Sequence, residues 1–385
     1  MPRHTAAAIG LAVLLCFSFG ARAEFQTVAR EAILIDVSTN TVLFEKDADL
    51  PMPPASMSKI MTAFMVFEKL REGSLSMDDT FTVSEKAWRK GGSKMFVEVG
   101  KEVRVEDLLR GVIVQSGNDA SIVLAEGLAG SEEAFAEAMT EKAREIGLTN
   151  SSFANATGWP DERQRMSARD LATLAQVIIE RFPEFYGFYS EKEFTWNGIR
   201  QGNRNPLLYR NTGADGLKTG HTEEAGYGLT ASAERNGRRL IMVATGLSSM
   251  KERGRESERI LSWGFREFNN YTLFKAGESV ETADVWLGDA MNVPLTSPQD
   301  IVVTLPRRAR KDMAVTVIYR QPVPAPIQEG DQIGSLRVTA PDIAPREYPL
   351  YAGHSVEQLG PFGRIVSALM YFVTGGPTGG AIGTP

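Results

Sequence analysis

The sequence has little cysteine and little histidine, and both shortages narrow the chemistry available to it. Its 385 residues include one cysteine and three histidines. Cys16 and His4 lie in an N-terminal segment that we expect to be removed, which leaves no disulfide and no thiol chemistry. The remaining histidines, His221 and His354, lie far apart and lack the spacing of metal ligands. We therefore expect neither a metal site nor a cofactor.

The scarcity of histidine also weakens the case for a histidine-based serine hydrolase. Such an enzyme would have to use His221 or His354, and no G-x-S-x-G sequence accompanies a candidate serine. If the chain is a serine hydrolase, its base is more plausibly a lysine. No stripe of basic residues stands out and the formal net charge is −6, so we expect no binding to nucleic acid.

Residues 1–23 have the pattern of a secretory signal peptide. A basic start precedes an apolar run at residues 6–19, and Ala21 and Ala23 place small residues before a predicted cleavage site at Glu24. The apolar run is shorter than the roughly 20 residues that a membrane-spanning helix requires. We therefore expect the mature chain to be secreted across the inner membrane.

The next unit, residues 24–274, interleaves strands with helices. Asn236-Gly237 predicts a tight hairpin between two of the strands. Strands joined by hairpins favour an antiparallel sheet flanked by helices, an α/β (α+β) arrangement. The predicted strands are residues 32–36, 41–44, 227–233 and 239–246, and the predicted helices include residues 131–146, 167–181 and 257–268.

The rest of the chain changes character. Residues 275–352 consist of short alternating runs separated by proline and glycine, which predicts a small all-β sandwich without a catalytic constellation. Residues 353–374 return to helical spacing, and Arg364 is the only charged residue between Gly360 and Gly375. This segment is either a helix docked on the β unit or an amphipathic membrane-anchoring helix, and we favour the anchor. The glycine-rich residues 375–385 are predicted to be disordered.

A serine and a lysine share one face of an apolar helix that follows Pro53-Pro54. Ser56 and Lys59 are three residues apart and are therefore neighbours on that helix. In one interpretation Ser56 caps the helix and Lys59 extends to solvent. In the other, Ser56 is a nucleophile and Lys59 accepts its proton.

Two further motifs favour the catalytic interpretation. Ser56-x-x-Lys59 is followed, in order, by Ser116-Gly117-Asn118 and by Lys218-Thr219-Gly220, a combination far more specific than any one of them. Lys59 must be neutral to act as a base, although a free lysine has a pKa of about 10.4. We expect burial and repulsion from Lys218 to lower the pKa of Lys59.

Each remaining motif residue has an expected task. Ser116 relays the proton to the leaving amine, and Asn118 hydrogen-bonds the substrate amide. Lys218 and Thr219 lie on an edge strand that pairs with an extended peptide. Gly220 lets the substrate approach the backbone closely.

The oxyanion is expected to be held by two backbone groups. These are the N–H of Ser56, near the start of its helix, and the N–H of His221, immediately after the third motif. His221 would then contribute through its backbone rather than through its imidazole.

With these motifs, the chain resembles a low-molecular-mass penicillin-binding protein of the D-alanyl-D-alanine carboxypeptidase type, serine peptidase family S11. The resemblance also includes the segments Phe194 to Asn205, Asp215 to Thr222 and Ala225-Gly226-Tyr227. The resemblance spans residues 32–372. It implies a penicillin-recognising, β-lactamase/transpeptidase-like domain, a small all-β C-terminal domain and an anchor on the outer face of the cytoplasmic membrane.

The resemblance also implies the reaction and its partners. The enzyme would remove the terminal D-alanine from peptidoglycan pentapeptides in the periplasm, with β-lactam antibiotics as covalent inhibitors. Arg253 matches the family arginine that receives the terminal carboxylate of the substrate; otherwise it is a solvated charge within residues 251–255. The anchor here has few basic residues and a glycine tail, unlike the family pattern.

Three alternatives use the same scaffold. A β-lactamase would need a second base, and no E-x-x-L-N sequence lies between Asn118 and Lys218, so slow loss of bound penicillin is expected. A D,D-endopeptidase that cuts cross-links stays open, because the sequence does not define the shape of the cleft. A catalytically silent wall-binding or drug-sensing protein is disfavoured by the intact motifs.

Overall fold

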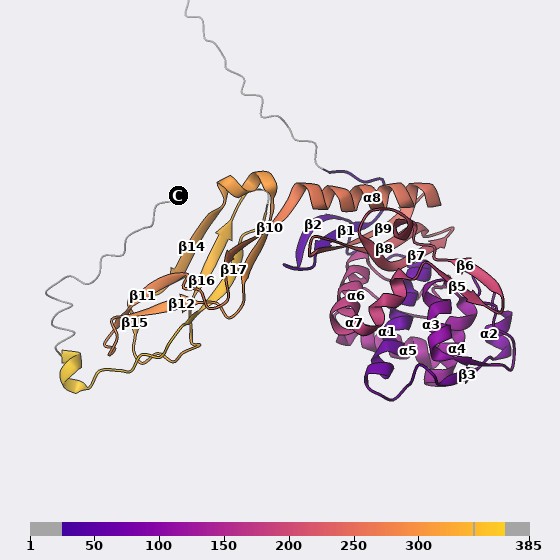
Figure 1. Ribbon diagram of the computed structural model, residues 1–385, viewed down its shortest axis with the longest axis horizontal. Coiled ribbons are helices and arrows are strands. Elements are labelled where there is room, and N and C mark those ends of the chain that lie inside the picture. The colour runs from indigo at the N-terminus through magenta and orange to yellow at the C-terminus, as the bar shows by residue number, and fades with distance from the viewer. Residues whose placement is uncertain (1–24, 342, 366–385) are drawn as a thin grey trace, which may run out of the picture.

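A five-stranded antiparallel sheet is the centre of the larger body of the molecule (Figure 1). The computed structural model describes residues 25–341 and 343–365. The sheet order is β2-β1-β9-β8-β7, which confirms the predicted antiparallel sheet. The strands are β1 (Ala32–Asp36), β2 (Thr41–Lys46), β7 (Ala214–Thr222), β8 (Gly226–Arg235) and β9 (Arg238–Leu247).

The predicted hairpin turn lies between β8 and β9. Asn236 and Gly237 have φ angles of 53° and 73°, the left-handed values that a two-residue hairpin turn requires. The turn makes β8 and β9 neighbours in the sheet, and β7 lies at the edge beyond β8.

Helices cover both faces of this sheet. On one face, α1, α3, α4, α5 and α6 enclose the larger apolar core, and α8 covers a second core on the other face (Figure 1). Ser131 and Ser167 cap α5 and α6, because their side chains accept a backbone N–H of the first turn. The main helices are α1 (Lys59–Arg71), α3 (Val105–Ile113), α4 (Asn118–Ala129), α5 (Glu132–Glu145), α6 (Ala168–Arg181) and α8 (Met250–Glu267).

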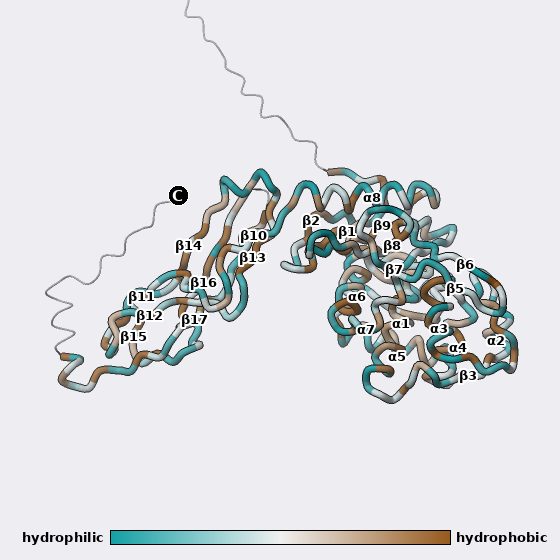
Figure 2. Tube along the Cα trace, viewed as in Figure 1, coloured by the Kyte–Doolittle hydropathy of each residue, from teal (hydrophilic) through white to brown (hydrophobic). Residues whose placement is uncertain are grey.

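Helix α8 starts earlier than predicted. The prediction began at Ser257, whereas the helix begins at Met250, after an N-cap at Ser249. The first two turns are rich in charged residues and lack an apolar period, so hydrophobic spacing could not reveal them. Hydrophilic residues occupy much of α8 in Figure 2. The consequence is that Arg253 lies inside a helix rather than in a loop.

Smaller elements surround the helical side. They are η1 (Ala55–Ser58), β3 (Thr80–Thr82), α2 (Glu85–Arg89), β4 (Glu102–Arg104), α7 (Pro183–Tyr186), η2 (Gly187–Ser190), β5 (Glu193–Trp196), β6 (Ile199–Gly202) and η3 (Pro206–Tyr209).

The C-terminal part is the predicted all-β unit. Its larger sheet has the order β14-β16-β17-β12-β11-β15, and β10 pairs with β13 beside it. Because β10 lies before residue 275 yet pairs with β13, the division at 274/275 stays a prediction. The elements are β10 (Phe268–Phe274), β11 (Glu281–Trp286), β12 (Asn292–Thr296), β13 (Ile301–Pro306), η4 (Arg307–Asp312), β14 (Ala314–Tyr319), β15 (Val323–Pro324), β16 (Gln332–Thr339) and β17 (Arg346–Ala352).

The predicted anchor is described only at its start. Residues 361–365 are helical, and Phe362 and Ile365 are 85% and 65% exposed. The remainder of the anchor, the glycine-rich tail and the predicted signal peptide lie outside the described residues. Within residues 25–341 and 343–365, no helix is both long enough and apolar enough to cross a membrane.

Candidate active site

Ser56 and Lys59 meet at the junction of η1 and α1. The tight turn of η1 carries Ser56, and α1 begins at Lys59. The Nζ atom of Lys59 lies 3.0 Å from the Oγ atom of Ser56. Lys59 is only 1% exposed, so it does not extend to solvent as the first interpretation required. The apolar surroundings of α1 therefore place an amine in hydrogen-bond contact with a serine hydroxyl.

Two oxygen atoms complete the surroundings of the Lys59 amine. It donates to Oδ1 of Asn118 at 2.8 Å and to the carbonyl oxygen of Thr157 at 2.5 Å. Burial lowers the pKa of Lys59 to about 7, and the positive charges of Arg204 and Lys90 act in the same direction. An amine with this pKa is substantially neutral at physiological pH.

The predicted role of Lys218 in this shift needs correction. Burial of Lys59 was predicted correctly, but the cations that lower its pKa are Arg204 and Lys90. The charge of Lys59 instead helps to lower the pKa of Lys218, which burial moves well below its ordinary value. The charge of Lys59 thus disfavours the charged form of Lys218.

Ser116 lies between the helices α3 and α4 in a left-handed conformation. Its φ angle of +62° is uncommon for a residue other than glycine, and such strain is frequent at functional sites. The Nζ atom of Lys218 donates to Oγ of Ser116 at 2.9 Å. The second and third motifs therefore meet although they are 102 positions apart in the sequence.

Both polar atoms of the Asn118 side-chain amide form hydrogen bonds within the protein. Its Oδ1 accepts from Lys59, and its Nδ2 donates to the carbonyl oxygen of Gly91 at 2.8 Å. The predicted contact with the substrate amide would have to use the second Nδ2 hydrogen or a free lone pair. The contacts present make Asn118 a link between Lys59 and the loop that follows α2.

The edge strand β7 passes beside the serine turn. A Cβ atom at Gly220 would lie 2.8 Å from the carbonyl oxygen of Pro54 and 3.1 Å from Cβ of Ala55. Glycine is therefore required here by the packing of β7 on η1. The close approach of the substrate to Gly220 stays a prediction. The His221 ring is exposed and stacks on Tyr227 at 3.8 Å between centroids.

Arg253 and Arg204 form a second cationic group near this strand. Arg253 is buried, which excludes its alternative interpretation as a solvated charge. It donates to the carbonyl oxygen of Arg204 at 3.3 Å, and its Nε atom is buried without a hydrogen-bond partner in the described part of the chain. Burial lowers the pKa of Arg253 to about 10, so it remains cationic at neutral pH.

Sequence reasoning missed two contributors to the site. Arg204 belongs to a segment quoted for the resemblance, but nothing in its spacing separated it from other surface arginines. The carbonyl oxygen of Thr157 carries no side-chain signal, and its role depends on the path of the loop before α6. Gly158 shows how tight that path is, because a Cβ atom there would lie 1.9 Å from the carbonyl oxygen of Ala55.

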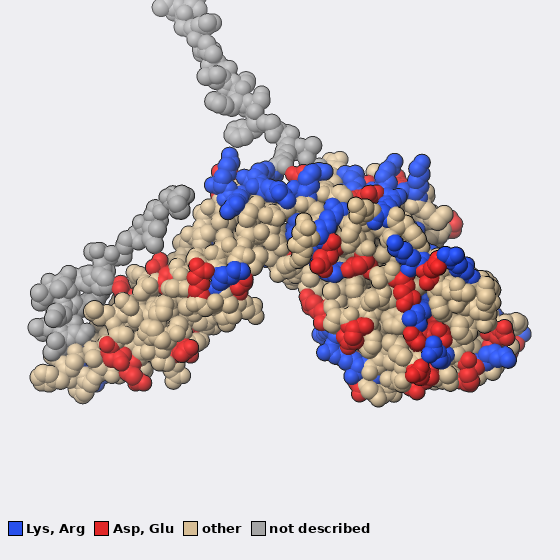
Figure 3. All heavy atoms as spheres, viewed as in Figure 1, with Lys and Arg blue, Asp and Glu red and all other residues tan. Residues whose placement is uncertain are grey.

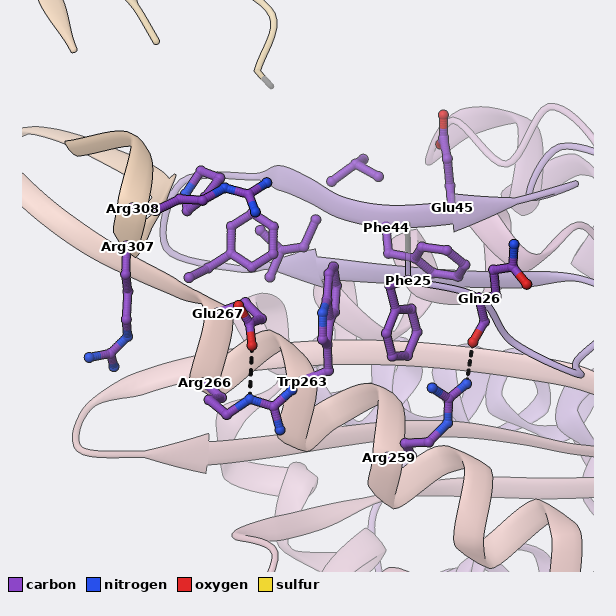
Figure 4. A pocket seen from close by; sticks show the side chains of 14 residues that line it. Phe25, Gln26, Phe44, Glu45, Arg259, Trp263, Arg266, Glu267, Arg307 and Arg308 are labelled. Atoms are coloured by element: carbon purple, nitrogen blue, oxygen red, sulfur yellow. Dashed lines mark hydrogen bonds and ion pairs between the residues drawn. The ribbon is translucent and has the colours of Figure 1, made fainter. Parts of the chain in front are cut away.

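A large cavity lies elsewhere, where β2, α8 and η4 approach one another (Figure 4). Its volume is about 1180 Å³, and none of the motif residues line it. Phe25 stacks on Trp263 inside it, with ring centroids 4.3 Å apart. Basic side chains gather along this edge of the molecule, over α8 and η4 (Figure 3). This cavity is therefore separate from the serine site.

The arrangement can support covalent catalysis without an imidazole. A hydroxyl faces an amine of lowered pKa, a second hydroxyl faces a second amine, and two arginines supply positive charge for an anionic substrate group. Within the described part of the chain, no cluster of three or more His, Cys, Asp or Glu residues could hold a metal ion.

Comparisons with known proteins agree over nearly the whole chain. The family model for D-alanyl-D-alanine carboxypeptidase matches residues 19–249, and the model for the C-terminal domain of penicillin-binding protein 5 matches residues 268–358. D-alanyl-D-alanine carboxypeptidase DacC of Escherichia coli is 40% identical over 377 residues, which cover 94% of each chain.

Solved structures show the same fold. Penicillin-binding protein 5 of Haemophilus influenzae superposes with a TM-score of 0.80 and 35% identity, covering 88% of this chain and all of that one. Penicillin-binding protein D2 of Listeria monocytogenes, in its ampicillin-bound form, has a TM-score of 0.58 and 30% identity over 64% of this chain and all of that one.

Proposed function

The chain belongs to the D-alanyl-D-alanine carboxypeptidase family, peptidase family S11, and from that premise we propose how its residues carry out the reaction. It is a serine-type D-Ala-D-Ala carboxypeptidase that acts on peptidoglycan and binds penicillins. The observation that carries our assignment of roles is the 3.0 Å contact between the buried Lys59 amine and the Ser56 hydroxyl.

Lys59 is the general base. A neutral amine has two N–H donors and one lone pair. The two N–H groups of Lys59 donate to Oδ1 of Asn118 and to the carbonyl oxygen of Thr157. The lone pair can therefore accept the hydrogen of the Ser56 hydroxyl. As Oγ of Ser56 attacks the carbonyl carbon of the penultimate D-alanine, its proton passes to Nζ of Lys59.

Ser116 delivers a proton to the departing amine. Collapse of the tetrahedral intermediate breaks the peptide bond, and the terminal D-alanine must leave as a protonated amine. The Ser116 hydroxyl, held by Lys218, donates that proton and is reprotonated from the amines beside it. Water then attacks the Ser56 ester, which releases the shortened peptide and restores the serine hydroxyl.

The cationic side of the cleft recognises the terminal carboxylate. The charge of Arg253 acts on Lys218 and therefore lies near the site, where a carboxylate would pair with the guanidinium. Arg204 adds a second positive charge. Lys218 and Thr219 lie on the edge strand β7, where an extended peptide gains backbone hydrogen bonds. We propose the backbone N–H groups of Ser56 and His221 as the oxyanion hole.

The comparisons favour a carboxypeptidase over the alternatives. A D-alanyl-D-alanine endopeptidase of Escherichia coli is 27% identical over 286 residues, well below the 40% identity and wider coverage of DacC. A β-lactamase would need a second base to clear the acyl-enzyme, and the sequence offers no E-x-x-L-N candidate. The penicillin-bound serine should therefore turn over slowly.

We also propose the domain limits and a peripheral location. The units are a signal peptide at 1–23, the peptidase domain at 24–274, the β domain at 275–352, an anchoring helix at 353–374 and a tail at 375–385. Exposure of Phe362 and Ile365 supports attachment to the outer face of the cytoplasmic membrane, since apolar side chains there have no core to enter.

Vesicle sedimentation tests the anchor. Mature protein should sediment with anionic phospholipid vesicles, and a variant that ends at residue 358 should stay in the supernatant with unchanged release of D-alanine. Equal sedimentation of both proteins would refute the anchor and leave the enzymatic assignment intact.

The activity itself is tested by release of D-alanine from a muramyl pentapeptide. The wild-type enzyme should release one D-alanine per peptide, and Ser56→Ala should release none while retaining its circular dichroism spectrum. Release by Ser56→Ala at the wild-type rate would refute the role of Ser56.

A further inference from the structure

An exposed aromatic ring and a lysine lie in contact with each other beside Asn118. Trp159 is 42% exposed although it follows the loop whose Thr157 carbonyl holds the catalytic lysine. The Nζ atom of Lys90 lies over the Trp159 ring, 4.4 Å from its centroid. Lys90 has no acidic partner among the described residues.

This pair is joined directly to the catalytic groups. Lys90 precedes Gly91, whose carbonyl oxygen accepts from Nδ2 of Asn118. A Cβ atom at Gly92 would lie 2.9 Å from Nδ2 of Asn118 and 3.1 Å from the Trp159 ring. The indole therefore lies beside the Asn118 amide. The positive charge of Lys90 also contributes to the lowered pKa of Lys59, as expected for two nearby cations.

The backbone of the loop that carries Trp159 is fixed by hydrogen bonds. Oδ1 of Asn155 accepts from the backbone N–H groups of Thr157 and Trp159, and Nδ2 of Asn155 donates to the Trp159 carbonyl oxygen. Close packing of Gly158 on the Ala55 carbonyl fixes the loop against the serine turn. An exposed aromatic ring on a fixed backbone is a binding platform that loses little conformational entropy when it is covered.

We propose that Lys90 and Trp159 form a specificity subsite for the residue that precedes D-alanyl-D-alanine in the stem peptide, and that this residue carries a free side-chain carboxylate. The proposal rests on the proposed function, in which Arg253 and Arg204 receive the terminal carboxylate. The preceding residue then extends toward Asn118 and Trp159. Its aliphatic side chain lies on the indole, and its carboxylate pairs with the ammonium of Lys90.

Two matched pentapeptides test this subsite. They differ only at the third residue, a diamino dicarboxylic acid whose side-chain carboxylate is free in one peptide and amidated in the other. The wild-type enzyme should show a kcat/KM about fivefold higher for the free carboxylate, the scale of a partly exposed ion pair, and the difference should reside in KM. Lys90→Gln should remove the preference.

The control variant is Lys311→Gln, which removes the same charge from η4 in the β domain and should keep the preference. Trp159→Ala should raise KM for both peptides, and Trp159→Phe should restore most of the loss. Equal kcat/KM for the two peptides in the wild-type enzyme would overturn the proposal. So would an equal loss for both peptides in Lys90→Gln, since Lys90 would then act only through the titration of Lys59.

Failure of the subsite can be told apart from failure of the proposed function. The acylation of Ser56 by penicillin does not involve the third residue of the stem peptide. An enzyme that acylates normally but does not distinguish the two peptides refutes the subsite alone. An enzyme that does not acylate refutes the proposed function.

Discussion

At the scale of single residues, the site depends on one amine that the fold keeps from being fully charged. Lys59 is surrounded by apolar residues of α1 and by two oxygen atoms, and no carboxylate of the described residues is in hydrogen-bond contact with it. Burial therefore dominates its pKa, and the nearby cations reinforce the effect. A carboxylate hydrogen-bonded to Lys59 would favour the charged form and would abolish its capacity to accept a proton.

This environment predicts an acidic limb in the pH profile of acylation. Only neutral Lys59 accepts the Ser56 proton, so the rate should rise with pH and reach half of its maximum near pH 7, the value to which its pKa is lowered. The measurement is the second-order rate constant for penicillin acylation between pH 5 and 9. Lys90→Gln should move the limb to higher pH, because it removes a cation that lowers the pKa. A rate independent of pH from 5 to 8 would contradict the role of Lys59.

At the scale of elements, the edge strand β7 and the turn η1 act as one unit. Gly220 lets the two backbones touch, and Gly158 brings the loop that holds Lys59 against the same turn. The positions of the nucleophile, its base and the substrate-binding strand therefore depend on two glycines that contact no reacting atom. Close packing of this kind transmits small shifts directly to the site.

Gly220→Ala should consequently harm catalysis more than stability. The new methyl group would lie 2.8 Å from the Pro54 carbonyl oxygen, so η1 and Ser56 must move. We expect a loss of at least about tenfold in the acylation rate with a cost of about 1–3 kcal/mol in the free energy of unfolding. Gly187→Ala is the matched control, since nothing lies within 4 Å of its added Cβ. Normal acylation by Gly220→Ala would show that this contact does not position the serine.

The sequence predicted the elements whose signals are local. The helices predicted at residues 131–146 and 167–181 and the Asn236-Gly237 turn need only neighbouring residues, and all three are present. The start of α8 was missed because its first turns are charged and are held by tertiary contacts. At the site, the residue types and their order were predictable, whereas the contribution of Arg204 to the charge of Lys59 depends on how distant segments pack.

At the scale of the whole molecule, a buried ion pair joins the central sheet to the β domain. Asp36 of β1 is fully buried and accepts from Nε of Arg238 at 2.6 Å. Its other oxygen accepts from Nδ2 of Asn270 in β10 at 3.2 Å. Nη1 of Arg238 donates to the backbone carbonyl oxygens of Gly264 and Phe268. One carboxylate therefore links β1, β9 and β10, the strand that pairs with β13 of the β domain, and α8 is attached through Arg238.

Asp36→Ala should destabilise the protein strongly, because it leaves the Arg238 charge buried without its partner. We expect a loss of about 3–5 kcal/mol in the free energy of unfolding, measured by urea denaturation. Glu347→Ala, which breaks the exposed pair with Arg337, should cost less than about 1 kcal/mol. Equal effects of the two substitutions would show that the buried pair contributes no more than a surface pair.

The central claim is that Ser56 is the nucleophile and that a neutral Lys59 activates it. Mass spectrometry of the intact protein and of its peptides after brief exposure to penicillin tests this claim most directly. We predict a single penicilloyl group on Ser56 that persists for minutes, and no adduct in Lys59→Ala, whose circular dichroism spectrum should match the wild type. An adduct on another residue, its loss within seconds, or normal labelling of Lys59→Ala would contradict the account.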